Sequence, residues 1–250
     1  MAIIKNTFDY AARVRASGLA GALGDMYGAP FEHARDKAGI EAVKATVTAS
    51  GLAPYNPKGY SPDGRPMDQE GLGAITDDTT MLGCTALGFV AAPPATAPMG
   101  ADDATLRTMY QAFLIWGSRQ LDGQSVMTQP VQGAKPLPTL IDKFAFFCGA
   151  GTGTLTALQQ GRMGTTDQPL VMHDKEGKPW ENNGCGGVMR TAPAGWLPAN
   201  YDAYAWGTAQ AAITHANPMA QAGAGFVALL IHKLLCGENL ATALDRSLYA

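Results

Sequence analysis

Two adjacent carboxylates occur in the run Thr76-Asp77-Asp78-Thr79. Because neighbouring negative charges repel, the pair needs a positive counter-field, which the N-terminus of a helix or a bound cation can supply. On these four residues alone, an ordinary N-cap is the simpler interpretation. The alternative is a bound divalent cation, since carboxylates and a threonine hydroxyl are hard oxygen ligands that suit Mg²⁺ or Mn²⁺ better than Zn²⁺.

A third carboxylate, Glu32, ends the run Gly-Ala-Leu-Gly-Asp-Met-Tyr-Gly-Ala-Pro-Phe-Glu that begins at Gly21. It follows a proline break, where it could project into a cleft, although taken alone it is more simply a solvated loop residue. Asp25 lies inside the same run and must find a partner or lie at a helix end, because an unpaired buried charge is costly. Gly21, Gly24 and Gly28 have a spacing that lets two helices approach closely.

A glycine-rich turn occurs in the run Asn-Asn-Gly-Cys-Gly-Gly-Val-Met-Arg from Asn182 to Arg190. Glycines ahead of a helix expose backbone N–H groups, which can form a cradle for an anion or a phosphate. The Gly149–Gly153 run opens another expected helix and is a second possible cradle. Each run is weak support by itself, and neither is a Walker A loop, because no Lys-Ser or Lys-Thr follows.

His215 lies in the run Thr-His-Ala-Asn-Pro, which reads as a polar turn between two helices because Asn-Pro ends a helix. The other histidines, His33, His173 and His232, form no metal-ligand spacing with it. A zinc site therefore has little support from the sequence. No Gly-x-Ser-x-Gly elbow occurs either, so nothing specific favours nucleophilic acyl transfer.

Helical periodicity dominates the elements that must position these residues. Leu19, Leu23 and Met26 follow an i, i+4, i+7 pattern and predict a helix over 9–27. Similar patterns predict helices over 77–90, 102–121, 153–161, 201–213, 218–236 and 238–249. Only 42–48 has a weak strand pattern, so an all-α fold is expected. The Gly- and Pro-rich stretches 50–75 and 164–187 lie between patterned helices and read as long loops, which inside a compact domain are usually functional or disordered.

The composition fits a single compact domain over residues 1–250. A net charge of −3 leaves no broad basic surface, so nucleic-acid binding is not expected. The four cysteines are far apart and form no Cys-x-x-Cys pair, which indicates reduced thiols in a cytoplasmic protein. No membrane span is expected, because the longest apolar run, 226–235, is short and contains His232 and Lys233.

Four motifs in order, between residues 18 and 224, resemble the ADP-ribosylglycohydrolase family, which includes the dinitrogenase reductase-activating glycohydrolases. They are G-A-L-G-D-x-x-G-A-P-x-E, T-D-D-T, N-G-x-G-G-x-M-R-x-A-P and T-H-x-x-P. The resemblance implies a compact bundle of crossing helices that holds two Mg²⁺ or Mn²⁺ ions in a cleft. It also implies hydrolysis of the glycosidic bond between ADP-ribose and a protein side chain, such as arginine or serine, or a small acceptor.

The resemblance also implies roles for particular residues of this chain. Thr76, Asp77 and Asp78 match the family's first set of metal ligands. Glu32 matches its acidic residue near the attacked carbon, so Glu32, Asp77 and Asp78 are the expected catalytic residues. The expected substrate-binding residues are Asn183, Gly184, Gly186, Gly187, Met189 and His215. The general chemistry agrees, since metals can polarise a water and a carboxylate can take its proton.

The chain departs from the family at its C-terminal end. Family members usually carry a Gly-Asp-Thr-Asp-Thr-type motif that supplies the remaining metal ligands, whereas residues 237–250 contain only Glu238 and Asp245 as acidic residues. One metal site is therefore expected to be incomplete. We favour a domain lacking its C-terminal portion over a natural short form or a site completed by a second chain. The alternative function is a non-catalytic ADP-ribose-binding or interaction protein. The oligomeric state cannot be read from the sequence.

Overall fold

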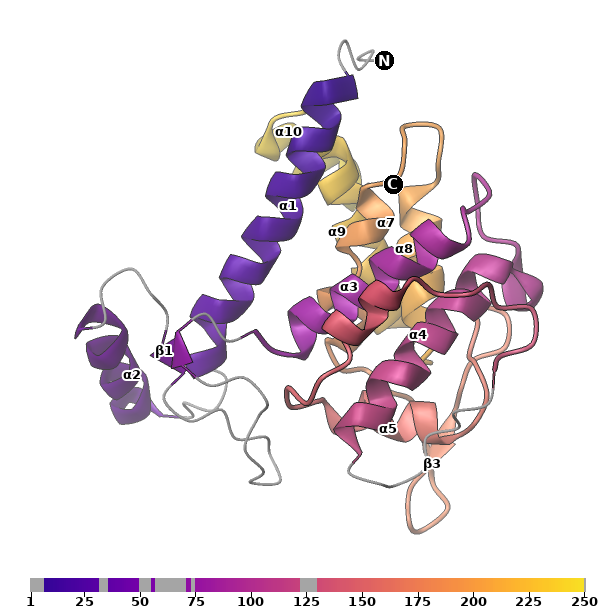
Figure 1. Ribbon diagram of the computed structural model, residues 1–250, viewed down its shortest axis with the longest axis horizontal. Helices are drawn as coiled ribbons and strands as arrows, with labels where there is room; N and C mark the ends of the chain where they lie inside the picture. The colour runs from indigo at the N-terminus through magenta and orange to yellow at the C-terminus, as the bar shows by residue number, and fades with distance from the viewer. Residues whose placement is uncertain are drawn as a thin grey trace.

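The computed structural model describes residues 7–31, 36–49, 55–56, 71–72, 75–121 and 130–249. Within this part the chain is mostly helical, which confirms the predicted all-α fold (Figure 1). The α-helices are α1 (Thr7–Gly28), α2 (Lys37–Ala49), α3 (Asp77–Ala91), α4 (Ala104–Gln120), α5 (Thr152–Gln159), α6 (Gly186–Met189), α7 (Ala192–Gly195), α8 (Ala203–Ala212), α9 (Pro218–Leu235) and α10 (Leu240–Leu248). The 3₁₀ turns are η1 (Ala29–Phe31), η2 (Gly100–Asp102) and η3 (Thr139–Lys143).

Short strands form two antiparallel ribbons in the described residues. In the first, β1 (Tyr55–Asn56) pairs with β2 (Gly71–Leu72) inside the Gly- and Pro-rich stretch 50–75. In the second, β3 (Met172–His173) pairs with β4 (Pro179–Trp180) inside 164–187. The alternation pattern of the sequence predicted neither ribbon, because two-residue strands are too short to show a period.

The predicted helices correspond to α1, α3, α4, α5, α8, α9 and α10, with small shifts at their ends. The starts of α3, α4, α8, α9 and α10 are set by side-chain caps that are local in sequence. Asp103 accepts a hydrogen bond from the Thr105 N–H at 2.8 Å, and Asp202, Asn217 and Asn239 cap α8, α9 and α10 in the same way. Local capping explains why these elements could be predicted from the sequence.

The weak strand prediction over 42–48 is wrong, because these residues lie inside α2. Asp36 caps this helix: its side chain accepts a hydrogen bond from the Gly39 N–H at 2.7 Å, and its carbonyl accepts one from the Ile40 N–H at 3.0 Å. The prediction gave too much weight to β-branched residues, whose strand preference is weak compared with an established helix start.

The hydrophobic core lies between α3, α4 and the α8–α9 pair. Phe89 and Trp206 pack edge to face with ring centroids 5.4 Å apart. Helices α8 and α9 are in close contact, since a Cβ added to Gly207 would lie 2.7 Å from the Ala224 carbonyl oxygen. This tightly packed half of the molecule carries the glycine turn and His215.

By length and composition alone, α9 could cross a membrane, because the Ala- and Gly-rich residues from Pro218 onward extend the apolar run 226–235. In the structure α9 packs against α6, α7, α8 and α10. Ala224 and Ala228 on this helix are fully buried. A third of the helix is buried, so α9 packs against these neighbours with part of its surface.

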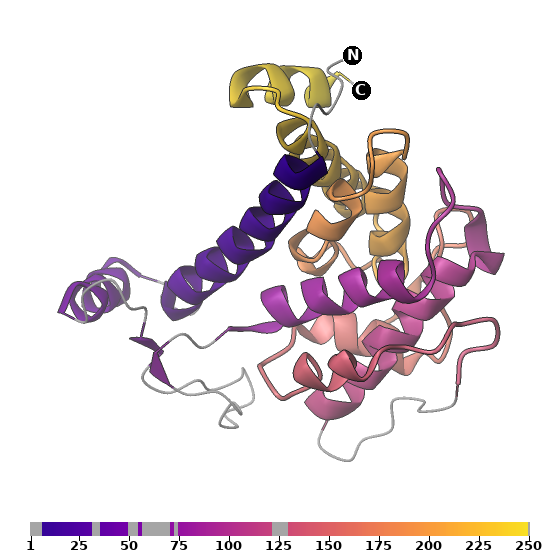
Figure 2. The ribbon, with the colours of Figure 1, turned by 45° about the horizontal axis from the view of Figure 1, so that its top comes forward.

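Helix α1 leads away from the main body, with α2 beyond its C-terminal end (Figures 1 and 2). Polar contacts hold its first half, where the Tyr10 hydroxyl donates to the Leu197 carbonyl at 2.7 Å and the Trp196 indole N–H donates to the Ser17 hydroxyl at 3.0 Å. Two leucines of its apolar stripe, Leu19 and Leu23, are 67% and 50% exposed. Hydrogen bonds therefore contribute much of the attachment of α1 to the rest of the protein.

Candidate active site

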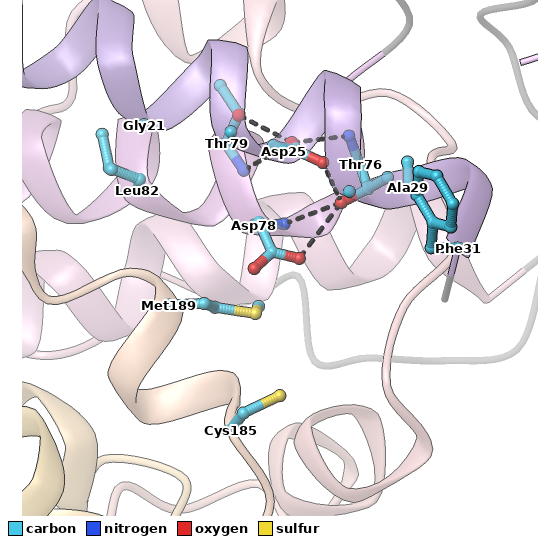
Figure 3. Close-up of a pocket in the computed structure, with 12 residues that line it drawn as sticks. Gly21, Asp25, Ala29, Phe31, Thr76, Asp78, Thr79, Leu82, Cys185 and Met189 are labelled. Atoms are coloured by element: carbon cyan, nitrogen blue, oxygen red, sulfur yellow. Dashed lines mark hydrogen bonds between the residues drawn. The ribbon is translucent and has the colours of Figure 1, made fainter. Parts of the chain in front are cut away.

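A cavity of about 520 Å³ lies where the end of α1, the start of α3 and the glycine turn before α6 meet (Figure 3). Asp25 and Phe31 line it from α1 and η1, Asp78 lines it from α3, and Cys185 and Met189 line it from the glycine turn and α6. Three of the four sequence motifs therefore contribute to one space, although they are far apart in the chain.

The two adjacent carboxylates lie at the first turn of α3, as the N-cap interpretation predicted. Thr76 is the N-cap residue, and its hydroxyl accepts a hydrogen bond from the Asp78 N–H at 3.3 Å. The same hydroxyl lies 3.1 Å from Asp78 Oδ2 and 2.7 Å from Asp25 Oδ1, and its single hydrogen is directed to the nearer carboxylate. The free N–H groups and the dipole at this helix end offset part of the charge of Asp77 and Asp78.

The charge of Asp25, which lies in an apolar helix, is stabilised by hydrogen bonds from the start of the neighbouring helix α3. Its Oδ2 accepts hydrogen bonds from the Thr76 N–H at 2.8 Å, the Thr79 N–H at 3.2 Å and the Thr79 hydroxyl at 2.7 Å. Its Oδ1 accepts one from the Thr76 hydroxyl at 2.7 Å. Asp25 therefore fixes the end of α1 against the start of α3, and with it one wall of the cavity.

We expect Asp25→Asn to lower the free energy of unfolding by about 1–3 kcal/mol, because the amide NH₂ cannot accept from the donors that surround the carboxylate. Chemical denaturation followed by circular dichroism measures this change. The matched control is Asp9→Asn, since Asp9 is an exposed residue of the same helix that pairs with exposed Arg13. Equal unfolding free energies for both variants would contradict the capping role of Asp25.

Asp77 and Asp78 have different neighbours although they are adjacent in sequence. Asp78 is exposed and lines the cavity. Asp77 accepts a hydrogen bond from the Gly151 N–H at 3.3 Å. The Gly149–Gly153 run, proposed above as a second anion cradle, thus directs one of its N–H groups to a carboxylate of the protein.

The donor set at the start of α3 fits a hard divalent cation in kind, since it contains two carboxylates and a hydroxyl. In the part of the chain that the structure describes, no three His, Cys, Asp or Glu side chains are grouped closely enough to hold a metal. Mg²⁺ usually keeps several water ligands, so a partial set of protein ligands is compatible with binding. Glu32, the remaining predicted carboxylate, lies outside the described residues and directly follows Phe31, which lines the cavity.

The glycine turn is tightly packed against His215. A Cβ on Gly186 would lie 2.7 Å from Thr154 Oγ1 and 3.3 Å from His215 Nε2, and a Cβ on Gly187 would lie 2.8 Å from Ala211 Cβ. The helix that follows, α6, has only four residues, so its dipole adds little to the binding of an anion. The glycines instead allow the turn to approach the imidazole.

The structure brings the predicted substrate-binding residues Gly184, Gly186, Gly187 and His215 together, and it places Met189 in the cavity lining. Asn183 is exposed in the same turn. His215 is buried, and burial together with the positive charge of Arg190 lowers its pKa to about 3 against the opposing effect of the Ala211 carbonyl. Its ring is therefore neutral near pH 7.

Buried Arg190 is the residue of this region that the sequence did not single out. Its side chain lies over the Phe113 ring, with the guanidinium carbon 4.2 Å from the centroid. Burial lowers the pKa of Arg190 to about 9. In the sequence, Arg190 could be recognised only as the last residue of the N-G-x-G-G-x-M-R motif. Its complete burial depends on helices that are distant in the sequence.

The four cysteines are free, as expected from their spacing. Cys84 and Cys148 are buried, and burial raises the pKa of Cys148 to about 12 and raises that of Cys84 as well. A thiol of raised pKa is a poor nucleophile at neutral pH, because the thiolate is the reactive form. The two buried cysteines are thus structural residues.

Comparison with known proteins agrees with this arrangement. Residues 6–250 match the protein family described as ADP-ribosylglycohydrolase, and no curated protein matches the sequence. Members of this family typically depend on a metal. The match extends through α1, the Thr-Asp-Asp-Thr start of α3, the glycine turn and His215, and it accompanies a mostly helical fold. The chain belongs to the ADP-ribosylglycohydrolase family.

Proposed function

We propose that the chain is a metal-dependent hydrolase that cleaves the glycosidic bond between ADP-ribose and a modified side chain or small acceptor. The observation that carries the proposal is the cavity of about 520 Å³ in which Thr76 and Asp78 share one space with Cys185 and Met189 of the glycine-turn region. This volume is within the range of sites for small-molecule ligands. Family membership supports an ADP-ribosyl group as the ligand.

Thr76, Asp77 and Asp78 would hold Mg²⁺ or Mn²⁺ in this proposal. When bound, the cation would supply positive charge and Lewis acidity toward oxygen atoms of the ribose and of the attacking water. The support is the chemistry of the donor set, which contains a hydroxyl and two carboxylates at one helix start. Asp25 would keep that set in place through its hydrogen bonds to Thr76 and Thr79.

The reaction forms a bond from a water oxygen to the anomeric carbon and breaks the bond to the acceptor nitrogen or oxygen, which gains a proton. Its transition state is oxocarbenium-like, and the carboxylates of Asp77 and Asp78 would stabilise the positive charge that develops. Glu32 would take the proton of the attacking water. The ADP-ribosyl group would be bound by Asn183, Gly184, Gly186, Gly187, Met189 and His215.

A second candidate is a non-catalytic protein that binds ADP-ribose. It is favoured by one observation, that the described residues contain no group of three or more potential metal-ligating side chains. Binding without efficient hydrolysis would need the cavity and the glycine turn but not a complete metal centre. Turnover of an ADP-ribosylated substrate distinguishes the two candidates.

We further propose that residues 1–250 act as one domain in the cytoplasm. The family match over 6–250 supports a single domain, as does one core cluster that joins residues from Met81 to Ala228. Four free cysteines are compatible with a reducing compartment.

The proposed function is tested by calorimetric titration of ADP-ribose into the 250-residue protein with Mn²⁺ and with excess chelator. We expect binding in the presence of Mn²⁺ and roughly tenfold or more weaker binding with chelator, because the cation would supply positive charge toward oxygen atoms of the ligand. Release of ADP-ribose from ADP-ribosyl-arginine and ADP-ribosyl-serine is then followed by chromatography. A folded protein that neither binds ADP-ribose nor releases it would overturn the proposal.

A further inference from the structure

The carboxylate of Asp77 is held by the connection 144–151, which runs from η3 to the start of α5. Asp77 Oδ2 accepts a hydrogen bond from the Gly151 N–H at 3.3 Å, and Gly151 is the N-cap residue of α5. A hydrogen bond from a connecting segment orients a side chain only if the segment itself is fixed by other contacts. The contacts that fix 144–151 therefore decide how Asp77 is oriented.

The buried side chain of Gln120 holds this connection on both sides of Phe147. Gln120 ends α4 and is 1% exposed. Its Nε2 donates to the Phe146 carbonyl oxygen at 2.6 Å, and its Oε1 accepts from the Cys148 N–H at 3.1 Å. The carbonyl can only accept and the main-chain N–H can only donate, so the orientation of the amide is determined. The two bonds together fix the position and the direction of the main chain.

Helix α3 holds the same connection through Cys148. The Cys148 sulfur lies 3.3 Å from Thr80 Oγ1. This oxygen accepts from the Trp116 indole N–H at 3.0 Å and lies 3.2 Å from the Thr76 carbonyl oxygen. Burial and, to a smaller extent, the charge of Asp77 raise the pKa of Cys148, in agreement with the proximity of the two residues. The connection is thus fixed to the helix that carries Asp77.

The Gln120 amide is buried where an apolar side chain could fill the space. Methionine is unbranched and of similar length, and it has no amide that would lose its hydration on burial. A buried hydrogen-bonded amide adds little net stability, but it is costly when unpaired, so it favours one position of the main chain over others. The position of the connection is therefore the property that Gln120 determines.

We propose that Gln120 is a positioning residue of the metal site: by fixing the connection 144–151 it places the Gly151 N–H, which restricts the orientation of the Asp77 carboxylate that would bind the cation. The effect on the cation rests on the function proposed above, whereas the contact between Gly151 and Asp77 belongs to the free protein. Gln120 itself would touch neither the cation nor the substrate. The cation is a hard divalent ion such as Mg²⁺ or Mn²⁺, which the donor set suits.

The free protein is tested by NMR on the full chain labelled with ¹⁵N at glycine, from the exchange of the Gly151 amide hydrogen with solvent. Gly151→Ala identifies the signal, since a Cβ built on Gly151 has no neighbouring atom within 4 Å among the described residues. We expect roughly fivefold faster exchange in Gln120→Met, the factor that corresponds to one typical hydrogen bond. Asp77→Ala, which removes the acceptor, is the reference and should give the same increase. An unchanged exchange rate in a folded Gln120→Met variant would overturn the proposal.

The Kd of Mn²⁺, measured from the electron paramagnetic resonance signal of the free ion, tests the effect on the cation. We expect Gln120→Met to raise this Kd roughly tenfold, the lower end of the cost of removing a group that orients a metal ligand. The matched control is Thr105→Val, which removes a buried hydrogen bond of 3.0 Å to the Ala92 carbonyl at the other end of α4. It should lower the denaturation midpoint and leave the Kd unchanged. An equal rise of the Kd in Thr105→Val would assign the effect to lost stability and overturn the positioning role.

Gly149→Ala is the second variant should Gln120→Met not fold. Gly149 has a φ of +74°, which strains an alanine, so the substitution shifts the chain between the Gln120 contacts and Gly151. We expect faster exchange of the Gly151 amide and a higher Kd for Mn²⁺. Wild-type values of both quantities in a folded Gly149→Ala variant would overturn the proposal.

The two measurements also separate this proposal from the proposed function. A wild-type protein that binds no Mn²⁺, although its Gly151 exchange responds to Gln120→Met, would overturn the effect on the cation together with the proposed function. A wild-type protein that binds Mn²⁺, with a Gly151 exchange rate that does not respond to Gln120→Met, would overturn the positioning role alone.

Discussion

Replacing Asp78 with asparagine is expected to lower turnover of an ADP-ribosylated substrate by roughly a thousandfold while the protein stays folded. Asparagine has nearly the same shape, and the substitution leaves in place the hydrogen bond from the backbone N–H of residue 78 to the Thr76 hydroxyl. The substitution removes the negative charge that lines the cavity. A loss of about 4 kcal/mol of transition-state stabilisation corresponds to that factor, because each 1.36 kcal/mol or so changes a rate about tenfold.

The test compares initial rates for ADP-ribosyl-arginine and ADP-ribosyl-serine with Mn²⁺, together with Mn²⁺ affinity and the free energy of unfolding. We expect kcat and Mn²⁺ affinity to fall while stability changes by no more than about 1 kcal/mol, which is the size of a charge effect at a helix N-terminus. Asp245→Asn, on an exposed position of α10, is the matched control and should leave all three quantities unchanged.

Asp77→Asn is the companion variant and is expected to act in the same direction. Asparagine can retain the hydrogen bond from the Gly151 N–H, so a large loss of turnover would reflect the charge of Asp77 more than the local fold. Wild-type rates and wild-type Mn²⁺ affinity in both variants would show that the start of α3 is not the metal site. A wild-type protein that binds ADP-ribose but does not hydrolyse an ADP-ribosylated substrate would favour the non-catalytic candidate.

Acid is expected to destabilise the protein through His215. Its pKa in the folded state is about 3, against an ordinary value of 6.5. Between these two pH values the unfolded chain binds a proton that the buried ring does not. The stabilising contribution is therefore complete above about pH 6.5 and is lost as the pH falls toward 3, at roughly 1.4 kcal/mol per pH unit. At pH 5 the loss from this residue is about 2 kcal/mol.

His232 is expected to act with the same sign. Burial, its largest cause, lowers the pKa of His232, so its neutral form is also favoured in the folded state. The Nδ1 atom of its ring lies 3.3 Å from the Gly195 carbonyl oxygen, between α7 and α9. The total loss of stability in acid should therefore exceed the contribution of His215 alone.

The measurement is the free energy of unfolding by chemical denaturation between pH 7.5 and 5. His215→Gln should reduce the pH dependence in this range by about 2 kcal/mol, because glutamine does not titrate. The control is His173→Gln, which removes an exposed imidazole in β3 and should leave the wild-type dependence in place. An unaltered pH profile in His215→Gln would contradict the assignment of acid sensitivity to the buried ring.

Much of the secondary structure could be predicted from the sequence, because its determinants are close together in the chain. The apolar spacing of α3 and α4 and the caps at Asp103 and Asn217 act within a few residues. An N-cap was expected at Thr76 or Asp77 for the same reason, and the structure shows that it is Thr76. The failure at 42–48 shows the limit of this approach, since a strand preference and a helix start compete over the same few residues.

The partners of buried polar groups could not be predicted in this way. Asp25 had to find a partner, but the sequence did not indicate that the partner would be the start of α3, 51 residues away at Thr76. From the sequence, Arg190 could be identified only as the last residue of a motif, and its burial could not be predicted. Its contacts with Phe113 and Gln210 come from helices that pack together only in the folded chain.

By itself, the sequence determined the helical class, most helix boundaries and the residue types available for metal and ligand binding. These properties follow from local periodicity, capping and the chemistry of individual side chains. The tertiary structure alone decided that Asp25 caps α3, that Asp77 and Asp78 have different neighbours, and that His215 is buried beside Arg190 and Thr214. The physical reason is that hydrogen-bond partners and burial depend on which distant segments pack together, and local sequence does not specify that packing.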